Sequence, residues 1–463
     1  MDDLRSLFEA QRRAARGPAP TLDERLGHLG MVAEMVMANR ARIERAMSDD
    51  FAVHPEQLTA MTEVLAVAGQ AAYTIEQLPG WMEPDPRPAD PALAGTATAA
   101  IEYQPKGVTG IISPWNFPFL LSLGPLIDML AAGNRVLIKP SEHTPASSAL
   151  LRDMVAETFA PDHVAVVTGD LELARRFPTL PWDHLLYTGN AAVGREVALA
   201  AARNLTPLTL ELGGKNPAIV EVVDAETVAQ IVGGKMVKSG QVCIAPDYCL
   251  VPAAQAAEFV DLARSYVADD YSRSPDCTGI ITDRHLDRLL ALLDEAKDSG
   301  CEVITLEPGA EVDRATRRIP LTLVLDPDDD LGLMREEISG AILPVKTYTS
   351  LDEAIDYVNA GDRPLGLYVF TSDATVARDV LDRTISGGAC VNTCALQGAL
   401  PSLGFGGSGT SGYGRHRGVE GFREFSNARG VVIRGENDAL AAFHPPYSGL
   451  AQAVVTAAFS QEG

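Results

Sequence analysis

One of the six cysteines of this 463-residue chain lies in a sequence context that could present a nucleophile. Gly240-Gln241-Val242-Cys243 follows a predicted helix, and backbone N–H groups in such a glycine-led turn can stabilise a thiolate or an oxyanion. A lone cysteine is more often a small buried hydrophobe, and this is our interpretation of the other five. Cys390 and Cys394 have no histidine or second cysteine pair nearby, so we expect no metal site.

Two polar residues at predicted strand ends could assist this thiol. Thr209-Leu210-Glu211-Leu212-Gly213-Gly214-Lys215 places Glu211 in an apolar strand end, where burial raises a carboxyl pKa toward that of a general base. Ser113-Pro114-Trp115-Asn116-Phe117-Pro118 places Asn116 in a rigid turn, where its side-chain amide could donate to a developing oxyanion. Taken singly, each motif has a plainer interpretation: a glutamate that caps a turn, and an asparagine that caps a helix.

Two further motifs could hold a nucleotide. Lys139 and Glu142 follow a predicted strand, and their side chains could bind ribose hydroxyls or simply be exposed charges. Thr188-Gly189-Asn190-Ala191-Ala192-Val193-Gly194 is a glycine turn that opens a predicted helix, and a helix N-terminus can bind a pyrophosphate. Many loops between a strand and a helix look like this one, so the turn alone indicates little.

Strands and helices alternate along the part of the chain that carries these motifs. Predicted strands cover residues 108–112, 135–139, 164–168, 184–187 and 206–212, and predicted helices cover 117–132 and 145–159. This alternation favours a parallel, doubly wound sheet, which binds its ligand at the carboxyl ends of the strands. We therefore expect the residues that directly follow the strands to meet at the site.

The alternation resumes beyond residue 213, with predicted helices 225–237, 256–268 and 284–297 and predicted strands 249–251, 303–306 and 321–325. We expect an α/β protein with a doubly wound, Rossmann-like dinucleotide-binding domain, a second α/β catalytic domain and a small oligomerisation segment. The predicted ranges are 1–82 and 103–212 for the first domain, 213–426 for the second, and 83–102 and 427–463 for the oligomerisation segment and tail.

Three shorter predictions concern local structure. Thr21 and Glu24 have the spacing of a capping box and predict the start of a helix. The Pro-rich residues 81–94 are expected to be an extended crossing segment, and the Gly-rich residues 404–414 are expected to be a loop.

The composition argues against several functional classes. A formal net charge of −24 makes nucleic acids and anionic membranes poor partners, because both would repel the protein. The first residues lack the basic start and apolar core of a secretory signal, and no apolar run reaches the roughly 18 to 20 residues that span a bilayer. Six cysteines in so long a chain do not suggest a disulfide framework, so we expect a cytoplasmic protein.

Together these motifs resemble the aldehyde dehydrogenase superfamily over nearly the whole chain. Four strings occur in the family's order and at nearly its spacing, at residues 114–118, 133–142, 210–217 and 240–243. The two motifs that carry Glu211 and Cys243 are separated by 243 − 211 = 32 positions. Within the superfamily, the chain is most similar to the short-tailed branch, which includes coniferyl aldehyde and fatty aldehyde dehydrogenases.

The resemblance implies a role for each candidate catalytic residue. Cys243 would attack the aldehyde carbon and form a thiohemiacetal, with the Asn116 amide and the Cys243 N–H as the oxyanion hole. Hydride transfer to a nicotinamide would leave a thioester, and Glu211 would activate the water that hydrolyses it.

The resemblance also implies a nicotinamide cofactor and a homodimer. Lys139 and Glu142 would hold the adenosine ribose and Glu337 the nicotinamide ribose. The other expected cofactor-binding residues are Trp115, Gly189, Asn190 and Gly194. Glu142 favours NAD, because its carboxylate would repel a 2′-phosphate, although some enzymes of this branch also use NADP.

This sequence departs from the family pattern at several positions. Ser339 and Ala341 replace a Phe and a Pro of the Glu-Glu-Ile-Phe-Gly-Pro string, and Asn190 replaces the usual Ser of the glycine turn. Gly404 stands where Pro commonly precedes Phe-Gly-Gly, and Lys238 where Asn is common. None of these changes removes a group that makes or breaks a bond, but they point to altered cofactor affinity.

The expected reaction is oxidation of a hydrophobic aldehyde, aromatic or medium-chain aliphatic, to the carboxylic acid. The basis is an entrance lined by apolar side chains near Trp115, Phe119, Leu120, Cys394 and Leu396. A CoA-acylating semialdehyde dehydrogenase is one alternative, and Glu211 argues against it because that route needs no water-activating carboxylate. A non-catalytic relative that kept only the fold is the other alternative, and retention of Cys243, Glu211 and Asn116 argues against that.

Overall fold

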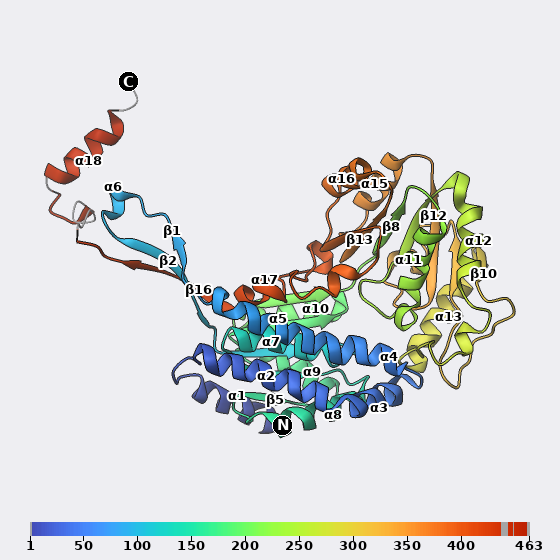
Figure 1. Cartoon of the computed structure of the whole chain (residues 1–463), viewed down its shortest axis with the longest axis horizontal. Helices are drawn as coiled ribbons and strands as arrows, with labels where there is room; N and C mark the ends of the chain where they lie inside the picture. Colours follow the sequence, from blue (N-terminus) through green and yellow to red (C-terminus); the bar gives the residue numbers. More distant parts are fainter. Residues whose placement is uncertain (1, 437–442, 448, 461–463) are drawn as a thin grey trace.

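The computed structural model describes residues 2–436, 443–447 and 449–460, and three β-sheets organise them (Figure 1). Two are large sheets with helices packed on them, and the third is a small sheet that projects as an arm (Figure 1). The α/β class and the doubly wound parallel sheet expected from the sequence are both confirmed.

The first large sheet has six strands in the order β15-β7-β6-β3-β4-β5. The five parallel strands are β3 (Val108–Ile112), β4 (Arg135–Lys139), β5 (Val164–Val166), β6 (His184–Gly189) and β7 (Leu208–Leu212). The chain builds β3, β4 and β5 outward in one direction and then β6 and β7 in the other. The direction therefore reverses between β3 and β6, the place where a doubly wound sheet opens a ligand crevice.

Helices cover both faces of this sheet. One face carries α7 (Leu120–Ala131) and α8 (Pro145–Thr158), with α2 (Leu22–Ala38), α3 (Arg40–Phe51) and α5 (Ala66–Trp81) packed outside them. The other face carries α10 (Ala191–Ala202) and α1 (Asp2–Ala14), and α9 (Leu171–Arg176) lies nearby. A short α4 (Glu56–Thr59) and a π-helical turn over Ala60–Leu65 lead into α5. The Thr21–Glu24 capping box is confirmed at the start of α2.

The second large sheet has seven strands in the order β10-β11-β12-β9-β8-β13-β14. The strands are β8 (Pro217–Val220), β9 (Tyr248–Pro252), β10 (Glu302–Thr305), β11 (Thr322–Leu325), β12 (Ile342–Tyr348), β13 (Gly366–Phe370) and β14 (Gly388–Val391). All neighbours are parallel except β10 and β11. Its helices are α11 (Ala225–Met236), α12 (Ala256–Tyr266), α13 (Asp283–Asp298), α14 (Gly332–Arg335), α15 (Leu351–Ala360) and α16 (Ala374–Arg383).

The small antiparallel sheet forms the arm. It contains β1 (Asp85–Arg87), β2 (Thr98–Pro105) and β16 (Ser426–Ile433), with α6 (Pro91–Ala94) at its tip and α18 (Gly449–Phe459) beyond it (Figure 1). The Pro-rich segment is therefore only partly extended, because it contains α6 as well as β1. Of the tail predicted at 427–463, residues 437–442, 448 and 461–463 lie outside the described residues. No helix in the described ranges is long and apolar enough to cross a membrane.

The Gly-rich segment 404–414 is not all loop. Its last residues begin β15 (Gly412–Tyr413), which pairs antiparallel with β7, so that Gly412 lies opposite Glu211. A Cβ atom on Gly412 would lie 1.9 Å from the Leu210 carbonyl oxygen, so only glycine permits this close approach. The following α17 (Gly418–Glu424) packs against α7. These elements fall in the range 213–426 but pack with the first large sheet.

Candidate active site

The candidate residues gather where the strands of the six-stranded sheet end. Asn116 follows β3, Lys139 ends β4, Asn190 follows β6 and Glu211 is the next-to-last residue of β7. Cys243 comes from the second large unit, in the segment between the 3-10 turn Val237–Gly240 and β9. The site is thus assembled by the docking of the two units.

An unusual backbone shapes the turn before Cys243. Lys238, Ser239 and Gly240 all have positive φ, at 54°, 53° and 75°. Only glycine fits the third position, because a Cβ atom there would lie 2.3 Å from the Gly340 carbonyl oxygen. Non-glycine residues in the left-handed region cost free energy and are retained where the surroundings hold them.

Two buried amide side chains hold this turn in place. Gln241 Nε2 donates to the carbonyl oxygens of Lys238 and Gly279, both at 3.0 Å. Asn216 Nδ2 donates to the carbonyl oxygens of Cys243 at 2.8 Å and Ala245 at 3.0 Å. Gln241 and Asn216 both stand in the motifs that the sequence points to, but their role in holding this turn is not predicted from the sequence. The sequence feature that could have indicated this role is an amide side chain within each of two glycine-containing strings.

Asn116 faces the same turn. Its Nδ2 donates to the Gln241 carbonyl oxygen at 3.2 Å, and its Oδ1 accepts from the Phe117 N–H at 3.1 Å. The structure therefore brings the Asn116 amide to the segment that carries Cys243, as an oxyanion donor would require.

Glu211 has a buried carboxyl group to which no described residue donates a hydrogen bond. It is 2% exposed, and neither carboxyl oxygen has a hydrogen-bond partner within the described part of the chain. Burial raises its pKa well above the ordinary value, and the nearby Arg415 and Arg417 guanidinium groups partly oppose that rise. A Cβ atom on Gly406 would lie 3.1 Å from Oε1, so this glycine leaves space for the carboxyl group.

Arg417 is a functional candidate that sequence reasoning did not single out. It is buried, its backbone N–H donates to Asp128 Oδ2 at 2.7 Å, and its guanidinium lies over the Phe405 ring at 5.6 Å. Its charge acts to lower the pKa of both Cys243 and Glu211. A buried cation that favours the ionised forms of a thiol and a carboxyl group suits a site that must generate both.

Cys243 is half-buried. Burial raises its pKa to about 12, and the carboxyl groups of Glu337 and Glu211 contribute to the rise. Burial also raises the pKa of Glu337 to about 8, with a further contribution from Asp247. The negative charge of Glu337 is therefore absent below about pH 8 and opposes thiolate formation above it.

This arrangement predicts a pH-dependent effect of Glu337→Gln on thiol reactivity. Above about pH 8 the variant should alkylate Cys243 about 2- to 10-fold faster than the unmodified protein, because a charge that raises the thiol pKa is gone. Below that pH the two rates should converge. The measurement is the rate of carbamidomethylation of the Cys243 peptide by iodoacetamide. Glu336→Gln, an exposed neighbour, is the matched control, and equal rates at every pH would refute the coupling.

The residues expected to bind a dinucleotide make two close contacts at strand ends of the six-stranded sheet. Lys139 Nζ pairs with Glu142 Oε2 at 2.7 Å, with Lys139 buried and Glu142 exposed. Glu337 lies directly over Gly213, since a Cβ atom there would fall 1.5 Å from Glu337 Oε2. Gly213 was not assigned a role from the sequence. The space that Gly213 leaves at Glu337, and the Lys139–Glu142 pair at the end of β4, suit the polar groups of a dinucleotide.

Asn190 has a task within its own helix. Its Oδ1 accepts from the Val193 N–H at 2.9 Å and so caps the N-terminus of α10. The flanking glycines permit close packing, since a Cβ atom on Gly189 would lie 2.3 Å from the Tyr187 hydroxyl and one on Gly194 2.7 Å from Leu212. The glycine turn therefore opens α10, as expected from its sequence.

The aromatic residues expected at the site have separate environments. The half-buried Trp115 ring lies 5.2 Å from His285 of α13 and so bridges the two large units. Phe119, expected at the substrate entrance, is instead fully buried in the helical core, because the turn that begins α7 directs it inward. Ser339, the departure near Glu337, has a left-handed φ of 48°.

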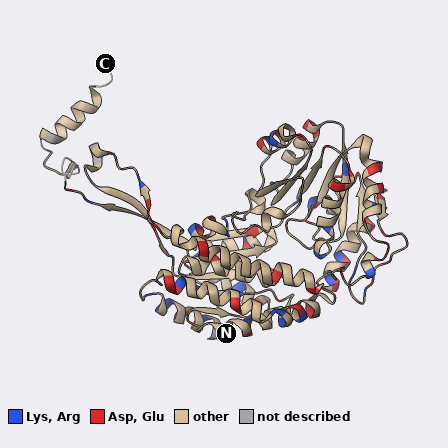
Figure 2. Cartoon of the chain, in the orientation of Figure 1, with Lys and Arg blue, Asp and Glu red and all other residues tan. Residues whose placement is uncertain are grey.

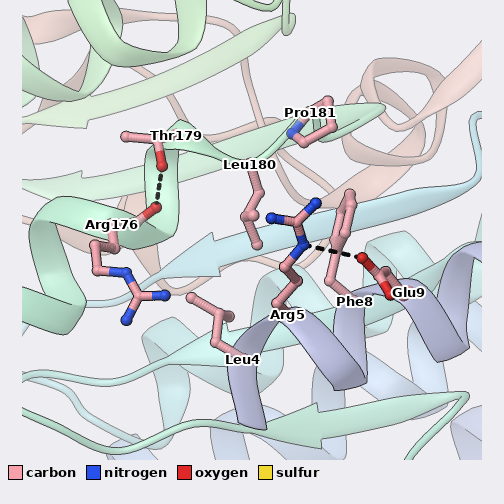
Figure 3. Close-up of a pocket in the computed structure, with 8 residues that line it drawn as sticks. All are labelled: Leu4, Arg5, Phe8, Glu9, Arg176, Thr179, Leu180 and Pro181. Atoms are coloured by element: carbon pink, nitrogen blue, oxygen red, sulfur yellow. Dashed lines mark hydrogen bonds and ion pairs between the residues drawn. The ribbon is translucent and has the colours of Figure 1, made fainter. Parts of the chain in front are cut away.

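A cavity elsewhere in the molecule has no connection with these groups. It has a volume of about 470 Å³ and lies between α1 and residues 176–181, on the outer side of the first large unit (Figure 3). Arg5 Nε, at this cavity, donates to Glu9 Oε1 at 2.9 Å (Figure 3). In the ranges that the structure covers, no group of three or more His, Cys, Asp and Glu side chains could hold a metal ion.

Comparisons with known proteins agree with this geometry. The family model described as "Aldehyde dehydrogenase family" matches residues 3–431. A probable coniferyl aldehyde dehydrogenase of Caulobacter vibrioides is 41% identical over 96% of this chain and 94% of its own length. The coniferyl aldehyde dehydrogenase of Pseudomonas sp. strain HR199 is 40% identical, with 100% of this chain and 97% of that protein covered.

Solved structures give the same result. The substrate-bound state of Staphylococcus aureus AldH superposes with a TM-score of 0.92 at 30% identity, covering 99% of this chain and 100% of that one. PnpE in complex with nicotinamide adenine dinucleotide has a TM-score of 0.85 at 25% identity, covering 94% and 90%. The chain therefore belongs to the aldehyde dehydrogenase family, whose enzymes oxidise aldehydes with NAD(P).

Proposed function

We propose that the substrate is a hydrophobic aldehyde, with an aromatic aldehyde ahead of a medium-chain aliphatic one. The observation that carries a catalytic role is the Cys243 turn, held against the Asn116 amide beside an untied, buried Glu211 carboxyl group. Relatives about 40% identical over nearly the whole chain are named coniferyl aldehyde dehydrogenases, which favours the aromatic class.

In this proposal the Cys243 thiol releases its proton to water, and the thiolate attacks the carbonyl carbon of the aldehyde. The Asn116 side-chain amide and the Cys243 N–H donate to the oxygen as it becomes negative. The chemistry that NAD supplies when bound is to accept the hydride of this adduct. Loss of that hydride leaves a thioester on Cys243. Glu211, once ionised, takes a proton from water as the water oxygen attacks the thioester. The C–S bond then breaks, the carboxylic acid is released, and Glu211 returns the proton to the Cys243 thiolate.

The proposed cofactor contacts follow the crevice. Lys139 and Glu142 would bind the adenosine ribose, α10 with Asn190 the pyrophosphate, and Glu337 above Gly213 the nicotinamide ribose. The ion pair keeps the Glu142 carboxylate where a 2′-phosphate would meet it, so NAD is the preferred cofactor.

We also propose a homodimer that uses the arm. The end of β16 exposes Val432 and Ile433, at 68% and 64%, and α18 carries no charged residue (Figure 2). An apolar strand end and an uncharged helix, both projecting from the body, suit contact with a second copy. The proposed dimer contact lies in the oligomerisation segment and tail predicted at 83–102 and 427–463. The other proposed domains are a dinucleotide-binding domain over 1–82 and 103–212 and a catalytic domain over 213–426.

A substrate panel tests the proposed function. Coniferyl aldehyde, benzaldehyde, hexanal and acetaldehyde are each supplied with NAD or NADP, and reduced nicotinamide is followed by absorbance. We expect the highest kcat/KM with an aromatic aldehyde and NAD, and the lowest with acetaldehyde. A preference for acetaldehyde would contradict the substrate class, and no reduction of either cofactor would contradict catalysis altogether.

A further inference from the structure

A fully buried ion pair lies behind the Cys243 turn. Lys238 Nζ is 3.3 Å from Glu63 Oε1, and both side chains are completely shielded from solvent. Glu63 belongs to the π-helical turn Ala60–Leu65, and single π-helical turns often occur at functional sites. Burying two charges costs desolvation free energy that their attraction repays only with good geometry and further hydrogen bonds. The contacts of each partner show where those bonds go.

Glu63 holds the start of α7. Its Oε2 accepts from the backbone N–H groups of Phe119 at 3.1 Å and Leu120 at 2.8 Å. A carboxylate at a helix N-terminus is stabilised by the unpaired N–H groups and by the helix dipole. Because Asn116 lies just before this point, Glu63 fixes the turn that carries Asn116.

Lys238 holds Asn116 itself. Its Nζ donates to the Asn116 backbone carbonyl oxygen and lies 4.0 Å from the centroid of the Phe117 ring. Asn116 Nδ2 in turn donates to the Gln241 carbonyl oxygen, and Gln241 Nε2 donates to the Lys238 carbonyl oxygen. Lys238, Asn116 and Gln241 thus form a closed ring of hydrogen bonds directly before the nucleophile.

We propose that Lys238, anchored by Glu63, is a positioning residue that sets the Asn116 amide against Cys243 for oxyanion stabilisation. An oxyanion donor acts only when it lies about 2.7–3.1 Å from the oxygen, so a small displacement of Asn116 costs much of its effect. Lys238 has a left-handed backbone, with φ of 54°, and its side chain contacts both Asn116 and Glu63. The inference rests on the proposed role of Asn116 as an oxyanion donor.

Two reactions of Cys243 separate this role from a merely structural one. Acylation by p-nitrophenyl acetate, without cofactor, passes through an oxyanion as the thiolate attacks the ester and p-nitrophenolate leaves. Alkylation by iodoacetamide displaces iodide and forms no oxyanion, but it needs the same thiolate. The ratio of the two rates therefore reports the oxyanion hole and cancels changes in thiol ionisation or access.

We expect Lys238→Met, which keeps the length of the side chain, to lower ester acylation by about 10- to 100-fold and alkylation by less than about 3-fold. Lys238→Arg, which retains a charged donor, should keep more of the ester reaction than Lys238→Met. Lys346→Met is the matched control, because Lys346 lies on β12 and pairs with Asp329. It should leave the ratio unchanged. Parallel losses in both reactions, or an unchanged ratio in Lys238→Met, would overturn the inference.

Glu63→Gln serves if Lys238→Met does not fold, because it keeps the shape and an oxygen acceptor while removing the charge. It should lower the same ratio to a smaller extent, and an unchanged ratio would count against the pair. Asn116→Ala separates the positioning role of Lys238 from the oxyanion role of Asn116. If Asn116→Ala lowers the ratio and Lys238→Met does not, the positioning role alone fails; if Asn116→Ala has no effect, the proposed oxyanion role fails as well.

Discussion

Cys243→Ala should lower kcat for aldehyde oxidation by about four orders of magnitude or more, because removing a covalent nucleophile leaves only binding and electrostatic effects. Three of the other five cysteines lie in packed surroundings. Cys249 and Cys277 are buried in packed regions, and Cys301 packs against the core of the seven-stranded sheet. The measurement is steady-state production of reduced cofactor, together with mass spectrometry of the acylated protein.

Cys301→Ala is the matched control for this substitution. It removes a half-buried thiol of the second large unit far along the chain from the Cys243 turn, and it should retain turnover. Detection of an acyl adduct on a peptide without Cys243, or turnover within tenfold of the unmodified protein in Cys243→Ala, would contradict the assignment of the nucleophile.

Glu211→Gln should separate the two halves of the reaction. Steady-state turnover should fall by about 10²- to 10⁴-fold, because an amide cannot take a proton from water. The first turnover should survive as a burst of reduced cofactor, since acylation of Cys243 does not need that proton transfer. Glutamine has the shape of glutamate, and neither Glu211 carboxyl oxygen accepts a hydrogen bond from the described residues. The substitution should therefore not disturb packing. Rapid mixing measures the burst, and mass spectrometry the accumulated thioester.

The pH dependence of deacylation follows from the same carboxyl group. Its pKa is raised well above the ordinary value, so the ionised base is scarce at low pH and increases as pH rises. The rate should therefore rise with pH in the unmodified protein, and Glu211→Gln should lose that rise. Glu307→Gln, at a buried glutamate that accepts from the Ser272 N–H, is the matched control and should leave the profile intact.

Adding coenzyme A distinguishes a hydrolytic enzyme from a CoA-acylating one. If water is the physiological acceptor, adding coenzyme A should not accelerate turnover of the unmodified protein. Faster turnover with formation of an acyl-CoA, and no loss in Glu211→Gln, would favour the CoA-acylating alternative.

The sequence alone determined the chemistry-bearing motifs and the type of sheet. Cys243, Glu211 and Asn116 lie in short strings whose glycines and prolines define a local backbone, and such local geometry depends on neighbours along the chain. The apolar strands that alternate with helices likewise predict a parallel sheet, with functional residues at its carboxyl ends. Residues 108–112 and 135–139 coincide with β3 and β4 for this reason.

Only the tertiary structure decided how the motifs are held and charged. Lys238 and Glu63 are 175 positions apart and meet only when the second unit docks onto the first. The glycine-rich segment adds β15 beside Glu211, a pairing that no local pattern indicates. The pKa values of Cys243 and Glu337 depend on burial and on charges from distant segments. Spacing along the chain specifies local backbone shape, whereas desolvation and long-range contacts arise only after packing. The contacts that hold the proposed catalytic residues were therefore visible only in the folded structure.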